Sequence, residues 1–119
     1  MREFKFRAWD KNDKCMRDWY NLQNHIYGKM KDNIFNDSGY IIMQFTGLYD
    51  KNRNEIYEGD ILSMEYFSDW IVNWYHYGFH IYNECNPGMQ HPLQYTDDRE
   101  VVGNIYEGRI SSDGRATAL

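Results

Sequence analysis

The amino-acid sequence predicts a small all-β fold. The chain has 119 residues, which is room for one hydrophobic core. Phe, Tyr and Trp make up 18% of it, and aromatic side chains fit the half-buried surface of a pleated sheet. Short apolar runs are separated by turn signals, and no run of about ten residues holds a helical apolar stripe. We therefore expect a barrel-type fold of about six or seven short strands, with at most one short helix.

The first strand is expected near the N-terminus. Phe4, Phe6 and Ala8 alternate with other side chains, mostly charged, over residues 3–9, which is the period of a half-buried strand. Rings interleaved with cations also occur in proteins that bind single-stranded nucleic acid. Here the two phenylalanine rings lie on the face opposite the cations, so the pattern favours an amphipathic strand with those rings in the core.

Turn signals divide the rest of the chain into further strands. Residues 15–35 have the weakest periodicity, and a short helix fits best around residues 16–23. Residues 86–99 are predicted to be a polar loop, because Asn-Pro-Gly opens them and polar residues follow. The further strands are predicted at residues 40–46, 56–62, 64–67, 70–75, 79–83 and 100–106.

Two corners of the chain share the tripeptide Asp-Lys-Asn, at residues 10–12 and at residues 50–52. In each case an aromatic-rich strand is expected to end at the aspartate. Asx side chains cap turns wherever the chain reverses, so we interpret the two segments as similar hairpin corners rather than as an internal repeat.

Charge and the composition of the N-terminus narrow the possible classes of protein. The chain carries 13 Lys and Arg against 18 Asp and Glu, a net charge of -5, which disfavours general nucleic-acid binding. Its N-terminus holds no apolar run of the length that a signal peptide or a membrane span requires. We therefore expect a cytoplasmic protein that does not enter a membrane, with Cys15 and Cys85 reduced.

No pattern of residues indicates an enzyme or a cofactor. Serine occurs in no Gly-x-Ser-x-Gly elbow, and there is no glycine-rich phosphate loop. Residues 50–54 begin like a calcium loop, but Glu55 stands where the sharp turn needs glycine. The acidic side chains of Glu55, Glu58 and Asp60 are interpreted as flanking or capping a turn rather than as catalytic. No catalytic or cofactor-binding residue is therefore predicted.

One group of residues raises the question of a metal site. His76, His80, Cys85 and His91 lie close together in the sequence, but their spacing matches no compact zinc motif and no Cys-x-x-Cys anchors one. His76 and His80 are expected to share one strand face. We favour exposed or ring-stacked histidines and predict no metal ligand, while metal binding by the group stays open.

Three ordered blocks of residues make the sequence recognisable. They read MREFKFRAWD at residues 1–10, QFTGLYDKN followed by EIYEGDI at residues 44–61, and EVVGNIYE at residues 100–107. With these blocks the chain resembles the YopX family of phage and prophage proteins. The resemblance implies a predominantly β fold with a barrel-like core, an origin in a phage or prophage of a bacterial host, and no particular biochemical activity.

The resemblance extends over nearly the whole chain. It implies a single β domain at residues 1–108, followed by a polar tail at residues 109–119. Glycine and Asx residues at strand ends serve backbone geometry first, so we interpret the motif residues as fold determinants rather than as a binding surface. These motif residues are Phe6, Arg7, Trp9, Asp10, Thr46, Gly47, Asp50, Tyr57, Glu58, Gly59, Asp60, Gly103, Asn104 and Tyr106.

The second Asp-Lys-Asn corner departs from the family pattern. Family members often carry glycine after this tripeptide, whereas this chain has Arg53. A left-handed backbone at a non-glycine residue costs about 1 kcal/mol. We therefore expect a longer type I turn at this corner.

Two functional hypotheses remain, and a third, an enzyme of unrecognised type, stays open because an active site can be assembled from residues distant in sequence. The first is a non-enzymatic module that binds a host or phage protein, because Tyr and Trp are favoured anchors of interfaces. The alternative is a small β-barrel that binds single-stranded nucleic acid through exposed rings, which the net charge makes second. Many rings on a short chain can exceed what one core hides, so self-association as a homo-oligomer is also expected.

Overall fold

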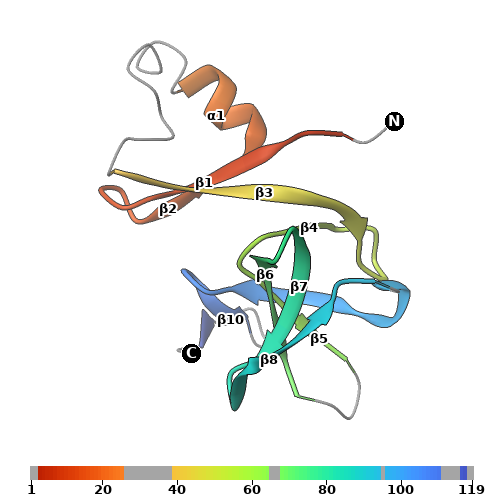
Figure 1. Ribbon diagram of the computed structural model, residues 1–119. Coiled ribbons are helices and arrows are strands. Elements are labelled where there is room, and N and C mark those ends of the chain that lie inside the picture. Colours follow the sequence, from red (N-terminus) through yellow and green to blue (C-terminus); the bar gives the residue numbers. More distant parts are fainter. Residues whose placement is uncertain (1–2, 26–38, 65–67, 95, 111–115, 118–119) are drawn as a thin grey trace. The chain divides into compact units, whose positions relative to one another are not determined.

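The computed structural model describes residues 3–25, 39–64, 68–94, 96–110 and 116–117 (Figure 1). Most of the described residues lie in β-strands, which confirms the predicted all-β fold class. The chain divides into two compact units, Met1–Phe45 and Thr46–Leu119.

The first unit is built on the predicted N-terminal strand. Strands β1 (Phe6–Asp10), β2 (Cys15–Arg17) and β3 (Tyr40–Tyr49) lie in the order β2-β1-β3, and β3 continues across the unit boundary. Ala8 is completely buried against Leu22, and Phe6 packs on this pair. The predicted inward face is therefore confirmed for these two residues, whereas Phe4 is exposed, so its predicted core position is wrong.

The helix of the first unit is α1 (Trp19–His25), close to its predicted place. The carboxylate of Asp18 accepts a hydrogen bond from the backbone N–H of Asn21 at 2.7 Å, which is the geometry of an N-terminal cap. Leu22 and Trp19 then place the apolar side of the helix against β1. Among the described residues, no helix is both long and apolar enough to cross a membrane.

The second unit contains a sheet with the strand order β11-β10-β9-β5-β6-β7-β8 in the described part of the chain. Irregular registers between Ile61 and Leu62 and between Tyr82 and Asn83 bend its strands, because a bulge adds local twist. The elements are β4 (Glu55–Tyr57), β5 (Asp60–Ser63), β6 (Trp70–Tyr75), β7 (Gly78–Asn83), β8 (Asn86–Pro92), η3 (Thr96–Asp98), β9 (Glu100–Asn104), β10 (Gly108–Ile110) and β11 (Ala116–Thr117).

The core of the second unit is aliphatic. Its fully buried members are Ile56, Leu62, Val72 and Ile81, and Trp70 is among the half-buried rings and aliphatic side chains that pack on them. These residues come from four different strands, so one cluster holds β4, β5, β6 and β7 together.

Several segments differ from the sequence prediction. The predicted loop at residues 86–99 contains strand β8, which lies at the sheet edge, the place where a strand tolerates proline. The predicted strand at 56–62 is two strands, because the backbone reverses at Gly59 with φ +86°. Strand β10 continues to Ile110, into the segment expected to be a tail, and pairs with β9. Residues 65–67 of the strand predicted at 64–67 lie outside the described residues.

Arg53 adopts the left-handed conformation that was expected to be avoided, with φ 68°. The carbonyl oxygen of Asp50 accepts a hydrogen bond from the N–H of Arg53 at 3.0 Å, which closes a four-residue turn. The N–H of Asp50 in turn donates to the carbonyl of Asn54 at 2.9 Å. The corner is thus a turn followed by one left-handed residue, and that residue is the arginine.

We expect Arg53→Gly to raise the free energy of unfolding by about 1 kcal/mol, because glycine accepts a left-handed backbone without a steric penalty. Urea denaturation followed by circular dichroism measures the change. Lys51→Gly is the matched control, since Lys51 lies in the same corner without a positive φ and glycine there should lower stability. Equal effects of the two substitutions would contradict strain at Arg53.

Candidate functional site

The motif residues supply most of the buried polar side chains. A buried polar group is costly unless it is hydrogen-bonded, so each of these residues is expected to have a specific partner. All of the buried polar residues in the described part of the chain except Thr96 belong to the motif. The full set is Asp10, Thr46, Asp50, Asp60, Thr96 and Asn104.

Asp50 joins its own corner to strand β9. Its Oδ1 accepts hydrogen bonds from the N–H groups of Asn52 and Asn54, both at 2.8 Å, and its Oδ2 accepts one from the N–H of Val101 at 2.9 Å. Burial by itself raises the pKa of the Asp50 carboxyl, but the hydrogen bonds from Val101, Asn54 and Asn52 outweigh it and hold the pKa below its ordinary value. The middle and last motif blocks therefore meet at one ionised carboxylate.

Asp10 caps the first corner in the same way. Its Oδ1 accepts the N–H groups of Asn12 and Asp13, each at 3.0 Å, and its Oδ2 accepts Arg17 Nη2 at 3.2 Å. The hydrogen bond from Asp13 lowers the pKa of Asp10, burial opposes this, and the Arg17 guanidinium and Asn12 lower it further. The prediction of two similar hairpin corners is confirmed by this shared capping.

The bend at Gly59 is capped within the middle motif block and is also joined to the last block. Asp60 Oδ2 accepts the N–H of Tyr57 at 2.8 Å across the bend at Gly59. The carbonyl of Gly59 accepts the N–H of Ile105 at 2.9 Å. Asp60 is also the register partner of Asn104, which places these two motif residues side by side on β5 and β9.

The bend after β9 depends on Gly103 and Asn104. A Cβ at Gly103 would collide with the carbonyl oxygen of Gly108, so any larger residue there displaces the backbone. Asn104 Oδ1 accepts the N–H groups of Tyr106 at 3.0 Å and Glu107 at 2.9 Å. Both residues therefore act on the backbone geometry of this bend.

The remaining motif residues are distributed along strands and bends rather than around one pocket. Thr46 Oγ1 donates to the carbonyl of Ile56 at 2.8 Å, which ties β3 to β4. Gly47 has φ +87° and open space where a Cβ would lie. Tyr57 is buried, and the half-buried motif residues are Phe6, Arg7, Trp9, Glu58 and Tyr106.

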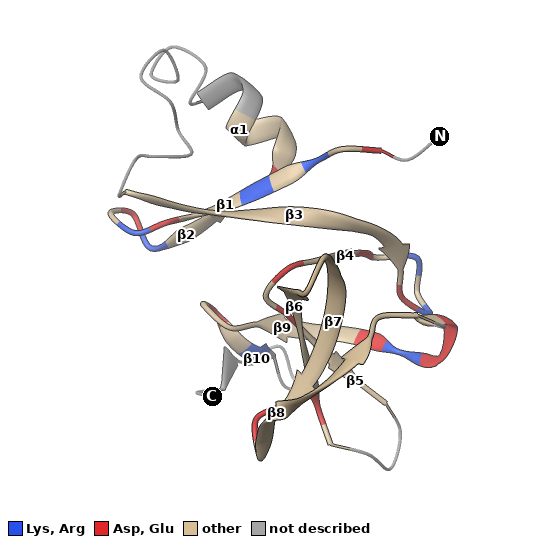
Figure 2. Cartoon of the chain, in the orientation of Figure 1, with Lys and Arg blue, Asp and Glu red and all other residues tan. Residues whose placement is uncertain are grey.

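The end of the β6–β7 hairpin exposes a group of aromatic rings, which we call the aromatic tip and define as Trp74, Tyr75, His76 and Tyr77. The relative exposure of these side chains reaches 51% for Trp74, 39% for Tyr75 and 94% for Tyr77. Residues 70–83 contain no Lys, Arg, Asp or Glu, as the tan strands β6 and β7 in Figure 2 show. The tip is therefore aromatic and carries no Lys, Arg, Asp or Glu.

The backbone of the aromatic tip is strained. Tyr75 and Gly78 are register partners, so His76 and Tyr77 form a two-residue turn, and both have positive φ, 45° and 68°. A turn of this kind prefers Asn-Gly, and each left-handed bulky residue costs about 1 kcal/mol. Strained positions of this kind cluster at functional sites.

Ring contacts hold the base of the tip. Trp74 and Phe79 face each other across the two strands with ring centroids 4.9 Å apart, at 83° to one another. The ring of Tyr75 packs edge-on against two histidine rings, with centroids 4.1 Å from that of His76 and 5.5 Å from that of His80. Tyr77 is left projecting from a base of packed rings.

The histidines and Cys85 do not form one cluster. His76 lies in the turn rather than on a strand, so the expectation that it shares a strand face with His80 is wrong. His91 packs edge-on against Trp70, with centroids 5.4 Å apart, as a ring-stacked histidine. In the described ranges no three His, Cys, Asp or Glu residues are grouped so that they could hold a metal ion.

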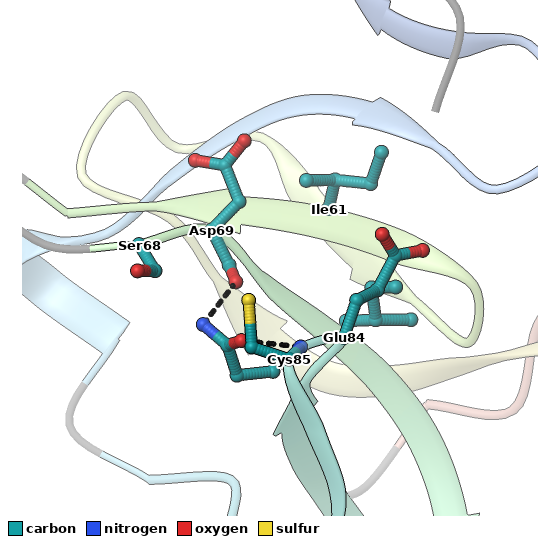
Figure 3. A pocket seen from close by; sticks show the side chains of 7 residues that line it. Ile61, Ser68, Asp69, Glu84 and Cys85 are labelled. Atoms are coloured by element: carbon teal, nitrogen blue, oxygen red, sulfur yellow. Dashed lines mark hydrogen bonds between the residues drawn. The ribbon is translucent and has the colours of Figure 1, made fainter.

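Cys85 lies beside a small cavity at the other end of the hairpin (Figure 3). The cavity has a volume of about 190 Å³. Asn83 Nδ2 donates to the backbone carbonyl of Asp69 at 3.3 Å and closes one side of it. The lining residues are Ile61, Ser68, Asp69, Ile71, Asn83, Glu84 and Cys85.

An open groove of about 430 Å³ lies along the second corner and includes Gly47 and Asp50 of the motif. Its charges are mixed, because Lys51 and Arg53 stand beside Asp97, and Lys51 lies 3.8 Å from Glu100. Asp50 is already occupied by backbone N–H groups. The groove therefore presents no convergent set of groups for one ligand.

Comparison with known proteins now fixes the family. The family model described as YopX protein matches residues 5–109. The chain belongs to the YopX family. The crystal structure of protein EF1440 from Enterococcus faecalis matches with a TM-score of 0.56 and 24% identity, over 90% of this chain and 96% of that one. This likeness concerns the fold alone, and no curated protein matches the chain.

The YopX motif does not include the aromatic tip or the cavity. Sequence reasoning predicted a corner near Tyr77, but it did not predict which rings are exposed or that two of the turn residues are left-handed. The available signal was the absence of charge from residues 70–83 in a chain that is 26% charged. The cavity gave no signal, because its lining comes from residues scattered between 61 and 85.

Asp50→Asn tests the capping role of the motif. We expect a loss of about 2 kcal/mol in the free energy of unfolding near pH 7. The substitution replaces one carboxylate oxygen with an amide nitrogen, which cannot accept the hydrogen bond of the backbone N–H that it faces. The folded-state pKa of Asp50 is lowered, so its contribution is present above the unfolded-state pKa of about 3.9 and is lost as pH falls through the folded pKa. Urea titrations at several pH values should show the gap to wild type narrowing below about pH 4. Asp97→Asn, at an exposed carboxylate, is the control.

The double substitution His76→Asn, Tyr77→Gly tests the strain in the aromatic tip. Asn-Gly suits a two-residue turn with positive φ, so the free energy of unfolding should rise by about 1 to 2 kcal/mol. Thermal and urea denaturation measure the change. A loss of stability would show that the two side chains stabilise the hairpin by more than the strain costs.

Proposed function

We propose that this YopX-family chain is a non-enzymatic protein-binding module and that the aromatic tip is its contact surface. The supporting observation is the combination of exposed rings with a strained turn. Tyr and Trp are the side chains most enriched among binding hot spots. A turn that retains His76 and Tyr77 at a cost in stability is accounted for if these rings have a partner.

Charge favours a protein over a nucleic acid as that partner. Single-stranded nucleic-acid binders combine stacking rings with cations that neutralise phosphates. Trp74 and Tyr77 could stack on bases, but residues 70–83 supply no Lys or Arg. Binding of single-stranded nucleic acid is therefore the alternative function.

The partner in this proposal is a bacterial host protein, a phage protein or a second copy of the chain. An uncharged ring cluster has no like-charge repulsion against its own copy, so the tip is suited to a symmetric homo-oligomer as well. We propose that the protein acts as a phage or prophage accessory protein in the cytoplasm of the bacterial host. Its family membership and its acidic composition are the grounds for this proposal.

Paired substitutions at two exposed aromatic sites test the proposal. Trp74→Ser with Tyr77→Ser removes rings of the tip, whereas Tyr20→Ser removes an exposed ring from the first unit. We expect wild type and Tyr20→Ser to capture the same protein from host lysate, and the tip variant to lose it. Light scattering over a concentration series checks whether that protein is a second copy.

Three results would count against the proposal. They are capture by the tip variant at the wild-type level, the absence of any reproducible partner, and tight salt-sensitive binding of a single-stranded oligonucleotide that needs the tip. The last result would establish the alternative function.

A further inference from the structure

The charges of the chain are divided unevenly between its two units. Met1–Phe45 holds eight Lys and Arg against six Asp and Glu, whereas Thr46–Leu119 holds five Lys and Arg against twelve Asp and Glu. The second unit therefore carries the negative net charge of the chain. Two copies of this unit repel each other wherever their acidic surfaces meet.

One stretch of the second unit is nearly free of charge. Residues 70–96, which include β6, β7 and β8, contain a single Lys, Arg, Asp or Glu, and the β6–β7 hairpin is tan in Figure 2. That residue is Glu84, which lies in the turn between β7 and β8, whereas the aromatic tip lies at the other end of β7. The tip is therefore a surface on which the second units of two copies can meet without placing like charges together.

The shape of the tip suits contact with its own copy. In a symmetric dimer the same patch faces itself, so a projecting group and a surface that receives it must both lie on that patch. Tyr77 projects with 94% exposure, and Trp74 is 51% exposed and is held at its base by Phe79. Tyr77 of each copy can therefore pack on Trp74 of the other.

The backbone of the tip is set before any partner arrives. The turn has only two residues, His76 and Tyr77, and the register pair Tyr75 and Gly78 closes it. A surface that is already ordered loses less conformational freedom on association than a flexible loop does. The strain that the turn carries in the monomer therefore goes with a lower cost of dimerisation.

We propose that the partner of the aromatic tip is the tip of a second copy, in a symmetric tip-to-tip dimer. This inference rests on the proposed function, because it names the partner of the same surface. The exposed fractions of Trp74, Tyr75 and Tyr77 leave roughly 400 Å² of ring surface on each copy, since such side chains bury about 150 to 250 Å² each. Stable interfaces bury about 800 Å² on each partner, so this dimer is weak, with a dissociation constant of about 10 µM to 1 mM.

Sedimentation equilibrium of the full chain, from about 1 µM to about 1 mM, measures this association. We expect wild type and Tyr20→Ser to dimerise equally, and Trp74→Ser with Tyr77→Ser to weaken the dimer at least tenfold. His76→Asn with Tyr77→Gly should weaken it as well. This second variant is expected to be more stable than wild type, so its loss of dimer cannot be attributed to unfolding.

A charge exchange tests whether the two tips face each other. Tyr77→Lys and Tyr77→Glu should each be monomeric alone, because a symmetric contact places like charges together. An equimolar mixture of the two variants should form a heterodimer. Added sodium chloride should leave the wild-type dimer unchanged or strengthen it, whereas it would dissociate a dimer in which the first unit of one copy pairs with the acidic second unit of another.

Four results would each overturn the inference. They are a wild type that stays monomeric up to about 1 mM, tip variants that dimerise like wild type, a dimer that salt dissociates, and no heterodimer in the mixture of charged variants. A monomeric wild type that still captures a host protein through the tip would overturn this inference and leave the proposed function intact.

Discussion

The arrangement of strands in the second unit depends most on the hydrogen bonds that the carboxylate of Asp50 accepts. It is buried, and it satisfies backbone N–H groups of its own corner and of Val101 on β9. Without it these donors would lie unpaired next to the core, which costs more than the hydrogen bonds themselves gain. Because β9 is also joined to β5, whose other neighbour is β6, one side chain sets the strand path from the second corner to the β6–β7 hairpin.

The cost of left-handed residues is offset differently at the two Asp-Lys-Asn corners and at the aromatic tip. Lys14 and Arg53 have positive φ, but each lies in a corner whose aspartate accepts two or more backbone hydrogen bonds. Those bonds offset the cost of the left-handed residue. At the tip, His76 and Tyr77 have positive φ in a segment that contains no aspartate. There the ring of Tyr75 packs on His76 and His80 but no aspartate caps the turn, so the tip is where a stability cost most needs a functional reason.

The sequence predicted features that have a local physical cause. Alternation placed Phe6 and Ala8 in the core, and Asx chemistry predicted both capped corners. Strand β8 was missed because an exposed edge strand has no buried face and therefore no apolar period. The exposure of Phe4 and the positive φ of Tyr77 depend on packing and on the β6–β7 register, which are long-range properties.

The tip and the cavity lie at opposite ends of one hairpin, whose strands have six residues each. At about 3.3 Å per residue the two features are separated by about 15 to 20 Å. A protein interface of ordinary size, about 800 Å² on each partner, can span that distance. Such a partner would pack its own side chains on the exposed rings of the tip and extend along the hairpin toward the cavity. A nucleic acid would instead meet the carboxylate of Glu84 at one end and no cation at the other, which is why the charge pattern favours a protein.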